Sequence, residues 1–151
     1  MTYKNILVAD DTTDEAEHVI RAAREIAADK NCTSSAVTVI RPMPDFYANL
    51  YSVLEDSPVI GIEERAVERA TEWLADLGER YGIDSGAVHV IVGTPSAEIS
   101  QLAAKIGADL IVMGTHGRHG LGLMLGSTAN AVLHGAPCDV LAVKVRAAGS
   151  Q

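Results

Sequence analysis

The chain has 151 residues, of which 48% are hydrophobic and 21% charged, a composition typical of one soluble globular domain spanning 1–151. Its net charge of −8 argues against duplex nucleic acid or an anionic membrane as the main partner, because both favour a basic surface. The two cysteines, Cys32 and Cys138, are too few and too far apart for a disulfide framework. The start has no signal-peptide pattern and no stretch approaches the ~18 apolar residues of a membrane span, so we expect a soluble cytoplasmic protein.

The first half of the chain alternates between strand and helix patterns. The apolar run 6–9 predicts a strand buried on both faces, and 36–40 predicts a second strand. Between them, Thr12 and Glu15 have the spacing of a capping box at the start of a helix. One apolar stripe of that helix is predicted to consist of Ala16, Val19, Ile20, Ala23 and Ala27.

A proline-containing connection, 41–58, leads to a longer helix predicted at 59–81. Its buried stripe should contain Ile62, Ala66, Ala70, Trp73 and Leu77. A third strand is predicted at 88–92 and a fourth at 109–113. Between these strands, Thr94 and Pro95 suit the N-cap and first position of a helix that buries Ile99, Leu102, Ala103 and Ile106.

The last elements are a short helix at 127–134 and a fifth strand at 139–145, followed by a tail at 146–151 that we expect to fray. Ser127 is predicted to be the N-cap of this helix. Gly135 is predicted to end it in a positive-φ conformation, and Pro137 prevents its continuation.

Five strands that alternate with helices predict an α/β fold, a three-layer doubly wound parallel sheet with strand order 3-2-1-4-5. In that order the first and fourth strands are neighbours where the winding reverses. Ligands of such sheets bind beyond the carboxyl ends of the strands at this crevice. The two loops that meet there would be 10–13 and 114–126.

The second of these loops is rich in glycine and ends at a helix. Segment 114–128 contains five of the thirteen glycines of the chain. Backbone N–H groups and the positive end of a helix dipole make such a loop suited to phosphate. A glycine loop with a serine cap and no ligand is the alternative interpretation. The spacing matches neither the P-loop nor the dinucleotide fingerprint.

Several segments of the chain resemble one known family. They are Tyr3–Asp11, Val92–Pro95, Val112–Arg118, Leu125–Ser127 and Pro137–Val143. In this order they are similar to the signature of the universal stress proteins, and the resemblance covers essentially the whole chain. It implies an adenine nucleotide alpha hydrolase-like fold and a role in stress adaptation. In nucleotide-binding members, nine residues separate the second glycine of the loop from the third, whereas here 118–125 provide eight.

The resemblance also implies a nucleotide site for ATP or AMP. It places Asp11 near the ribose, Ala9 and Asp10 along the pocket, and Met113 beside the nucleotide. The residues implied around the phosphates are Gly114, His116, Gly117, Gly126, Ser127 and Thr128, and Arg118 completes the set. Arg41 stands where the family usually has a valine against the adenine, and it could stack on a purine or point to solvent.

Other roles are open to these residues. Asp10 and Asp11 could instead cap a helix or form a turn. Mg²⁺ or Mn²⁺ is expected only together with a nucleotide, with Asp11 the candidate contact. The spacing of His116 and His119 occurs in zinc sites, but a glycine loop fixes ligands poorly. Ser127 lacks the Gly-x-Ser-x-Gly context of a hydrolase, so no catalytic residue is predicted.

Three functions follow, in order of preference. The first is a nucleotide-binding regulatory module that acts as a homodimer. The resemblance and the apolar fifth strand 140–145, whose bare edge would otherwise invite aggregation, imply pairing through that strand. The second is a ligand-free interaction protein that keeps the fold. The third is a slow ATPase or autophosphorylating enzyme, for which Asp11 is the only candidate carboxylate.

Overall fold

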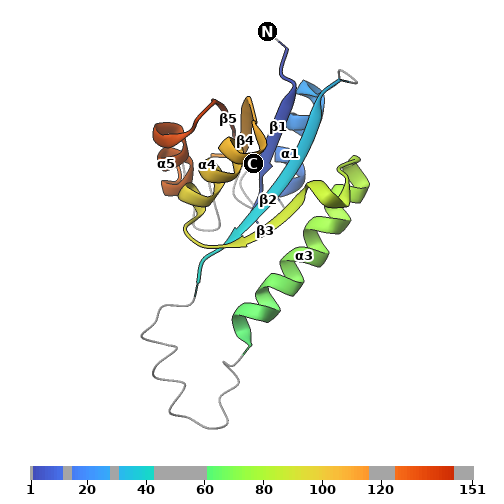
Figure 1. Ribbon diagram of the computed structural model, residues 1–151, viewed down its shortest axis with the longest axis vertical. Helices are drawn as coiled ribbons and strands as arrows, with labels where there is room; N and C mark the ends of the chain where they lie inside the picture. The colour runs from blue at the N-terminus through green and yellow to red at the C-terminus, as the bar shows by residue number, and fades with distance from the viewer. Residues whose placement is uncertain (1, 12–14, 28–30, 43–60, 116–124, 145–151) are drawn as a thin grey trace, which may run out of the picture.

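The structure is a computed structural model, and it describes residues 2–11, 15–27, 31–42, 61–115 and 125–144. In this part of the chain, five parallel strands form one sheet (Figure 1). They are β1 (Asn5–Ala9), β2 (Thr33–Ile40), β3 (Val88–Val92), β4 (Leu110–Gly114) and β5 (Asp139–Val143). Their order is β3-β2-β1-β4-β5, which confirms the predicted topology.

Helices cover both faces of the sheet. They are α1 (Ala16–Ile26), α3 (Ile62–Tyr81), α4 (Pro95–Ile106) and α5 (Ser127–Gly135), and a 3₁₀ turn, η1 (Ser85–Ala87), precedes β3. Ile6 and Val8 of β1 pack in a core cluster with α1 and α3. Leu7 and Ala9 pack in a second cluster with α4 and α5. The two clusters on opposite faces of the sheet confirm the three-layer arrangement.

The central strands are apolar because both of their faces are buried. Ile6, Leu7 and Val8 are 0% exposed, as are Ile111 and Val112 of β4. Each large side chain of this kind contributes roughly 1.5–3 kcal/mol to folding when it is fully buried. The resulting rigid strands fix the positions at which the loops beyond their carboxyl ends begin.

The buried stripe of α3 differs from the predicted one. Ile62 is 42% exposed, whereas Leu74, absent from the predicted stripe, is fully buried. The helix begins at Ile62 rather than near Val59, with Gly61 as its N-cap residue. Its first turns extend past the sheet (Figure 1), so the stripe meets the core only from Ala70 onward.

Capping predictions at the start of α1 and at the end of α5 are wrong. Glu15 is the N-cap residue of α1 rather than the third residue of a capping box, and Thr12 lies outside the described residues. Gly135 is the last residue of α5 and does not have a positive φ. The next residue, Ala136, leaves the helix in an extended conformation (φ −68°, ψ 142°) because it precedes Pro137.

Several element boundaries differ from the predicted ones by a few residues. β2 begins at Thr33 instead of Ala36, and β4 covers 110–114 instead of 109–113. The Asp109 side chain instead accepts hydrogen bonds from the backbone N–H groups of Lys4 and Asn5 at 2.8 and 3.0 Å. β5 ends at Val143, and residue 145 lies outside the described part.

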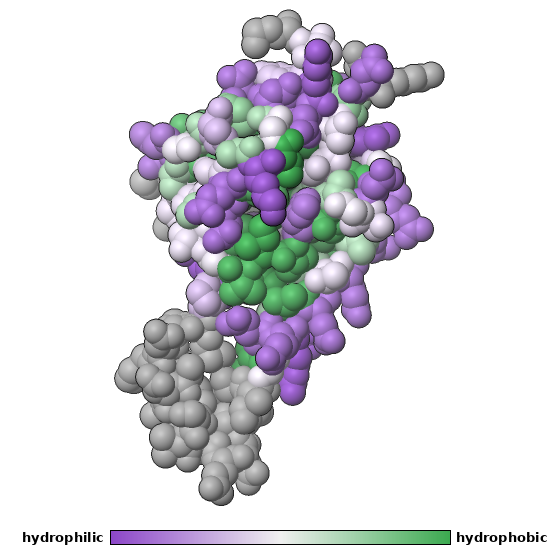
Figure 2. All heavy atoms as spheres, viewed as in Figure 1, coloured by the Kyte–Doolittle hydropathy of each residue, from purple (hydrophilic) through white to green (hydrophobic). Residues whose placement is uncertain are grey.

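Two strands, β3 and β5, form the edges of the sheet. On the face shown in Figure 2, apolar side chains gather in the middle and polar ones surround them. Val92 of β3 and Leu141 of β5 are each 36% exposed. Among the described helices, none is long and apolar enough to cross a membrane.

Candidate functional site

The candidate site lies where β1 and β4 end side by side. Ala9 pairs with Met113 across these strands and with Val37 on the other side. One residue further, the register brings Asp10 beside Gly114 and Thr38. The Asp10 N–H donates to the Val37 carbonyl at 2.9 Å, and the Thr38 hydroxyl donates to the Asp10 carbonyl at 3.1 Å. The backbone of Asp10 is therefore held as an extension of β1.

The Asp10 side chain is buried without a hydrogen-bond partner among the described residues. It is 7% exposed, and both carboxylate oxygens are shielded from solvent. Burial first, and then the charge of Asp11, raise the pKa of this carboxyl well above its usual value. An unpaired buried acid of this kind costs stability, so its presence at the end of β1 requires a separate explanation.

Strand alternation places Asp10 on a different face of the sheet from α5. Ile6 and Val8 face α1 and α3, and Asp10 continues this series. Ala9 lies on the opposite face, in the same cluster as Met113, which is 5% exposed. The Asp10 side chain therefore lies on the opposite face of the sheet from Ala9, Met113 and α5, which makes it less suited than Ala9 and Met113 to contact a ligand at the start of α5. Asp11, the next residue, is half-buried.

The start of α5 is fixed to the end of β4. The Gly126 N–H donates to the Thr115 carbonyl at 2.6 Å, and the Thr115 N–H donates to the Val143 carbonyl at 2.9 Å. Gly126, not the predicted Ser127, is the N-cap residue, with an extended conformation (φ −62°, ψ 154°). Ser127 and Thr128 are the first two helical residues, and the N-cap residue, a glycine, has no side chain that could cap the helix.

This arrangement places the first N–H groups of α5 next to the end of the sheet. The first amides of a helix have no acceptor within the helix itself. Together with the positive end of the helix dipole, they form a favourable environment for an anion such as phosphate. The structure thus places the start of α5 beside Thr115, directly after β4, whose Met113 pairs with Ala9 of β1.

The other predicted residues are not gathered there by the described part of the structure. His116, Gly117 and Arg118 lie outside the described residues, and so does His119. Arg41 follows β2 and is exposed. Among the residues that the structure describes, no group of three or more His, Cys, Asp and Glu side chains could hold a metal ion.

Sequence reasoning missed two residues that shape the site. Thr38 is 3% exposed and fixes the carbonyl of Asp10. The sequence feature that could have indicated Thr38 is that it is the one polar residue in the apolar segment 36–40. Thr115 connects β4, β5 and α5 through its backbone, which no side-chain pattern reports.

The comparisons with known proteins agree with this architecture. The model of the Universal stress protein family matches residues 2–144. The chain belongs to the universal stress protein family. It is 40% identical over 144 residues to Universal stress protein A homolog 1 of Coxiella burnetii, a match that covers 95% of this chain and 97% of that protein.

Solved structures of universal stress proteins and related chains share the fold. The hypothetical protein MJ0577 matches with a TM-score of 0.77 at 24% identity, covering 98% of this chain and 100% of its own. A universal stress protein in complex with cAMP matches with a TM-score of 0.63 at 24% identity, covering 95% and 98% of the two chains. The fold is thus adenine nucleotide alpha hydrolase-like, as the resemblance implied.

Proposed function

We propose that this universal stress protein binds an adenine nucleotide, ATP or AMP, at the crevice between the ends of β1 and β4. The observation that carries the proposal is the Gly126–Thr115 hydrogen bond of 2.6 Å, which holds the start of α5 against the end of β4. The cAMP bound to a structural relative supports a nucleotide as the ligand class. Phosphate would lie at the amides of Ser127 and Thr128, and the ribose near Asp11.

The acidic character of the protein is compatible with this ligand. A net charge of −8 disfavours polyanions over most of the surface, so an anion needs a local source of positive potential. Backbone amides at a helix start provide one without a basic side chain. Mg²⁺ or Mn²⁺ would enter together with the phosphates.

In this proposal the protein acts as a homodimeric regulatory module of the stress response. β5 is an edge strand with a half-buried apolar pattern, and Leu141 is 36% exposed. Pairing two copies through this edge would satisfy its free backbone groups and cover its apolar side chains. Ligand binding would order the crevice and change the surface that a partner protein meets.

The experiment for the ligand uses the purified full chain. Denaturation should release adenine nucleotide that co-purified with the protein, identifiable by chromatography as ATP, ADP, AMP or cAMP. Thermal melts of nucleotide-free protein should then show stabilisation by the same nucleotide, about 2.7 kcal/mol at 100 times the Kd. No release and no stabilisation by any of these nucleotides at millimolar concentration would contradict the proposal.

One observation favours a second candidate, a nucleotide-free interaction module. Arg41 is exposed at the position where the resemblance implies a residue packed against the adenine. An exposed arginine would leave the base without an apolar contact on that side. The thermal melts separate the two candidates, because a nucleotide-free module should melt at the same temperature with and without Mg-ATP.

A further inference from the structure

The side chain of Glu98 folds back over Gly93 at the junction between β3 and α4. Gly93 directly follows β3, and its N–H donates to the Ile40 carbonyl at 2.9 Å. Glu98 lies in the first turn of α4, into which the chain turns from β3 (Figure 1). A Cβ built on Gly93 would lie 2.7 Å from both Cγ and Oε1 of Glu98. The carboxylate therefore lies against the backbone at the carboxyl end of the sheet.

This carboxylate lies on the face of the sheet that bears the candidate site. α4, which carries Glu98, packs in the same core cluster as Ala9 and Met113 at the ends of β1 and β4. Arg41 is the neighbour of Gly93, because β2 and β3 pair in parallel up to the residue before each of them. Alternation along β2 places Arg41 on this face as well. Two opposite charges thus stand at the neighbouring ends of β2 and β3.

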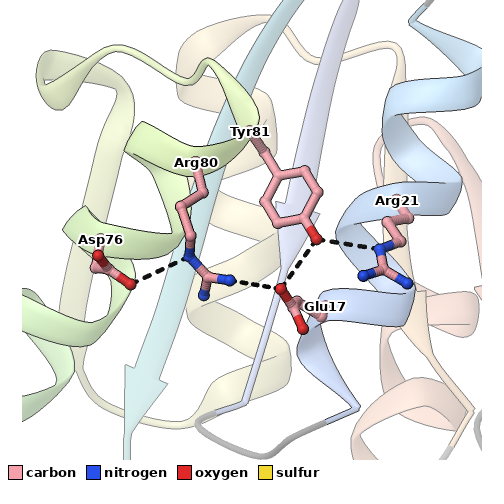
Figure 3. Close-up of polar contacts among 5 residues, drawn as sticks. All are labelled: Glu17, Arg21, Asp76, Arg80 and Tyr81. Carbon is pink, nitrogen blue, oxygen red and sulfur yellow. Dashed lines mark hydrogen bonds and ion pairs between the residues drawn. The ribbon is translucent and has the colours of Figure 1, made fainter.

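Glu98 makes no hydrogen bond or ion pair with another described residue, although it is half-buried. Glu17 of α1 shows the contrasting arrangement, because its carboxylate accepts hydrogen bonds from Arg80 and Tyr81 of α3 (Figure 3). Arg41 is also without a partner among the described residues. The positive end of the α4 dipole favours an acid in the first turn. A half-buried carboxylate nevertheless loses hydrogen bonds to water, so its position favours a donor from outside the chain.

The order of the strands determines which part of a nucleotide would reach Glu98. With phosphate at the start of α5 and ribose near Asp11, the nucleotide runs from β4 to β1, and its base continues over β2 towards β3. The ends of β1 and β3 are two strand spacings apart, about 10 Å, which a nucleoside can span. On an adenine base the exocyclic amino group is the hydrogen-bond donor, and a carboxylate is an acceptor only.

We propose that Glu98 reads the base of the nucleotide, because its carboxylate accepts a hydrogen bond from the amino group of adenine. This inference rests on the proposed nucleotide-binding function and names the residue that sets its base specificity. Gly93 is a positioning residue, since any side chain there would occupy the place of the Glu98 carboxylate. A base without the amino group would leave the half-buried carboxylate without its donor, which is how a site of this kind discriminates.

The test compares ATP with purine riboside triphosphate, which lacks only the amino group of the base. Calorimetry on the full chain should give a Kd for ATP about tenfold lower than that for the analogue, as expected for one hydrogen bond to a charged group. Glu98→Ala should bind the two nucleotides equally. Glu98→Gln keeps an acceptor without the charge and should retain a preference of about threefold. The matched control is Glu72→Ala, an exposed glutamate of α3 on the other face of the sheet, which should keep the wild-type preference.

Gly93→Ala removes the same contact without changing Glu98. Gly93 does not have a positive φ, so an alanine keeps the backbone conformation, and its Cβ displaces the flexible Glu98 side chain. The preference for ATP should fall to the level of Glu98→Ala. The double variant should lose no more than either single variant, because both substitutions remove one shared interaction. Urea midpoints near that of the wild type would show that the fold is kept.

The outcomes distinguish the base contact from nucleotide binding itself. A wild-type protein that binds ATP and purine riboside triphosphate with equal Kd would overturn the inference and leave the proposed function intact. A preference for ATP that persists in Glu98→Ala would also overturn the inference alone. A wild-type protein that binds neither nucleotide at millimolar concentration would overturn both the inference and the proposed function.

Discussion

The N–H of Gly126 donates to the carbonyl of Thr115 across 2.6 Å, so that the first residue before α5 is bonded to the first residue after β4. Thr115 is in turn bonded through its own N–H to Val143 of β5. This places the start of α5 in a fixed relation to the end of the sheet. The candidate site depends on that relation more than on any single side chain.

Replacement of Gly126 by alanine should weaken ATP binding while the protein keeps its fold and most of its stability. Gly126 has φ −62° and ψ 154°, which an alanine also adopts without strain, so the loss of stability should be below about 1 kcal/mol. If phosphate approaches this backbone closely, an added methyl group should weaken binding of ATP about tenfold or more. Urea unfolding and calorimetry measure the two effects.

The control for this variant is Gly135→Ala at the other end of α5, where a Cβ would meet no atom within 4 Å. Its ATP affinity should equal that of the wild type. Wild-type affinity in Gly126→Ala as well would contradict a close approach of phosphate to this residue.

Asp10→Asn should change the pH dependence of stability. The pKa of Asp10 is raised in the folded protein, so its favourable contribution is present below the unfolded value near 3.8 and is lost as the pH rises through the folded value. The neutral amide cannot ionise. The free energy of unfolding of the variant relative to the wild type should therefore increase with pH.

Urea unfolding at a series of pH values between 4 and 8 would measure this difference. Asp84→Asn is the control, since Asp84 is exposed and makes no side-chain capping bond. A stability difference between Asp10→Asn and wild type that stays constant with pH would show that Asp10 is charged in the folded protein at all these values.

Gly107→Ala should destabilise the protein through its backbone alone. Gly107 ends α4 with φ 69° and ψ 36°, a left-handed conformation, and a Cβ there would meet no atom within 4 Å. The expected loss is about 1–2 kcal/mol. Gly135→Ala, where φ is not positive, should cost nothing. Equal midpoints of thermal unfolding for the two variants would refute the conformational argument.

Leu141→Glu should disrupt the proposed homodimer. A charge on the apolar edge of β5 would be buried without a partner on pairing, and two copies would repel each other. Analytical ultracentrifugation should show dimers for the wild type and monomers for the variant. Leu133→Glu on α5, a residue that is 44% exposed, is the control and should stay dimeric. A monomeric wild type would argue against the dimer itself.

Much of the fold was predictable because it follows from local pattern. Short apolar runs such as 6–9 are long enough for strands buried on both faces, and they alternate with helical stripes, which restricts the topology to a few strand orders. Four of the five residues predicted for the stripe of α1 are buried for the same reason, namely Ala16, Val19, Ile20 and Ala23, whereas Ala27 follows the helix and is half-buried.

The details that were not predictable depend on neighbours distant in sequence. Periodicity cannot tell how far α3 extends past the sheet, so Ile62 was wrongly placed in the core. A glycine at the end of a helix often adopts a positive φ, whereas the residue before a proline is extended. At the end of α5 the extended conformation of Ala136 before Pro137 determines how the helix ends. The burial of Asp10 arises only when β1 lies between β2 and β4 in the sheet. The ligand, its contacts and the dimer stay predictions.

The measurement that tests the central claim most directly is the response of individual backbone amides to ATP, followed by ¹⁵N NMR of the full chain. The account predicts that the amide resonances of Gly126, Ser127 and Thr128 shift progressively with added Mg-ATP, while that of Gly135 at the far end of α5 does not. If millimolar Mg-ATP leaves the first three resonances in place, phosphate does not bind at the start of α5 and the proposed site is wrong.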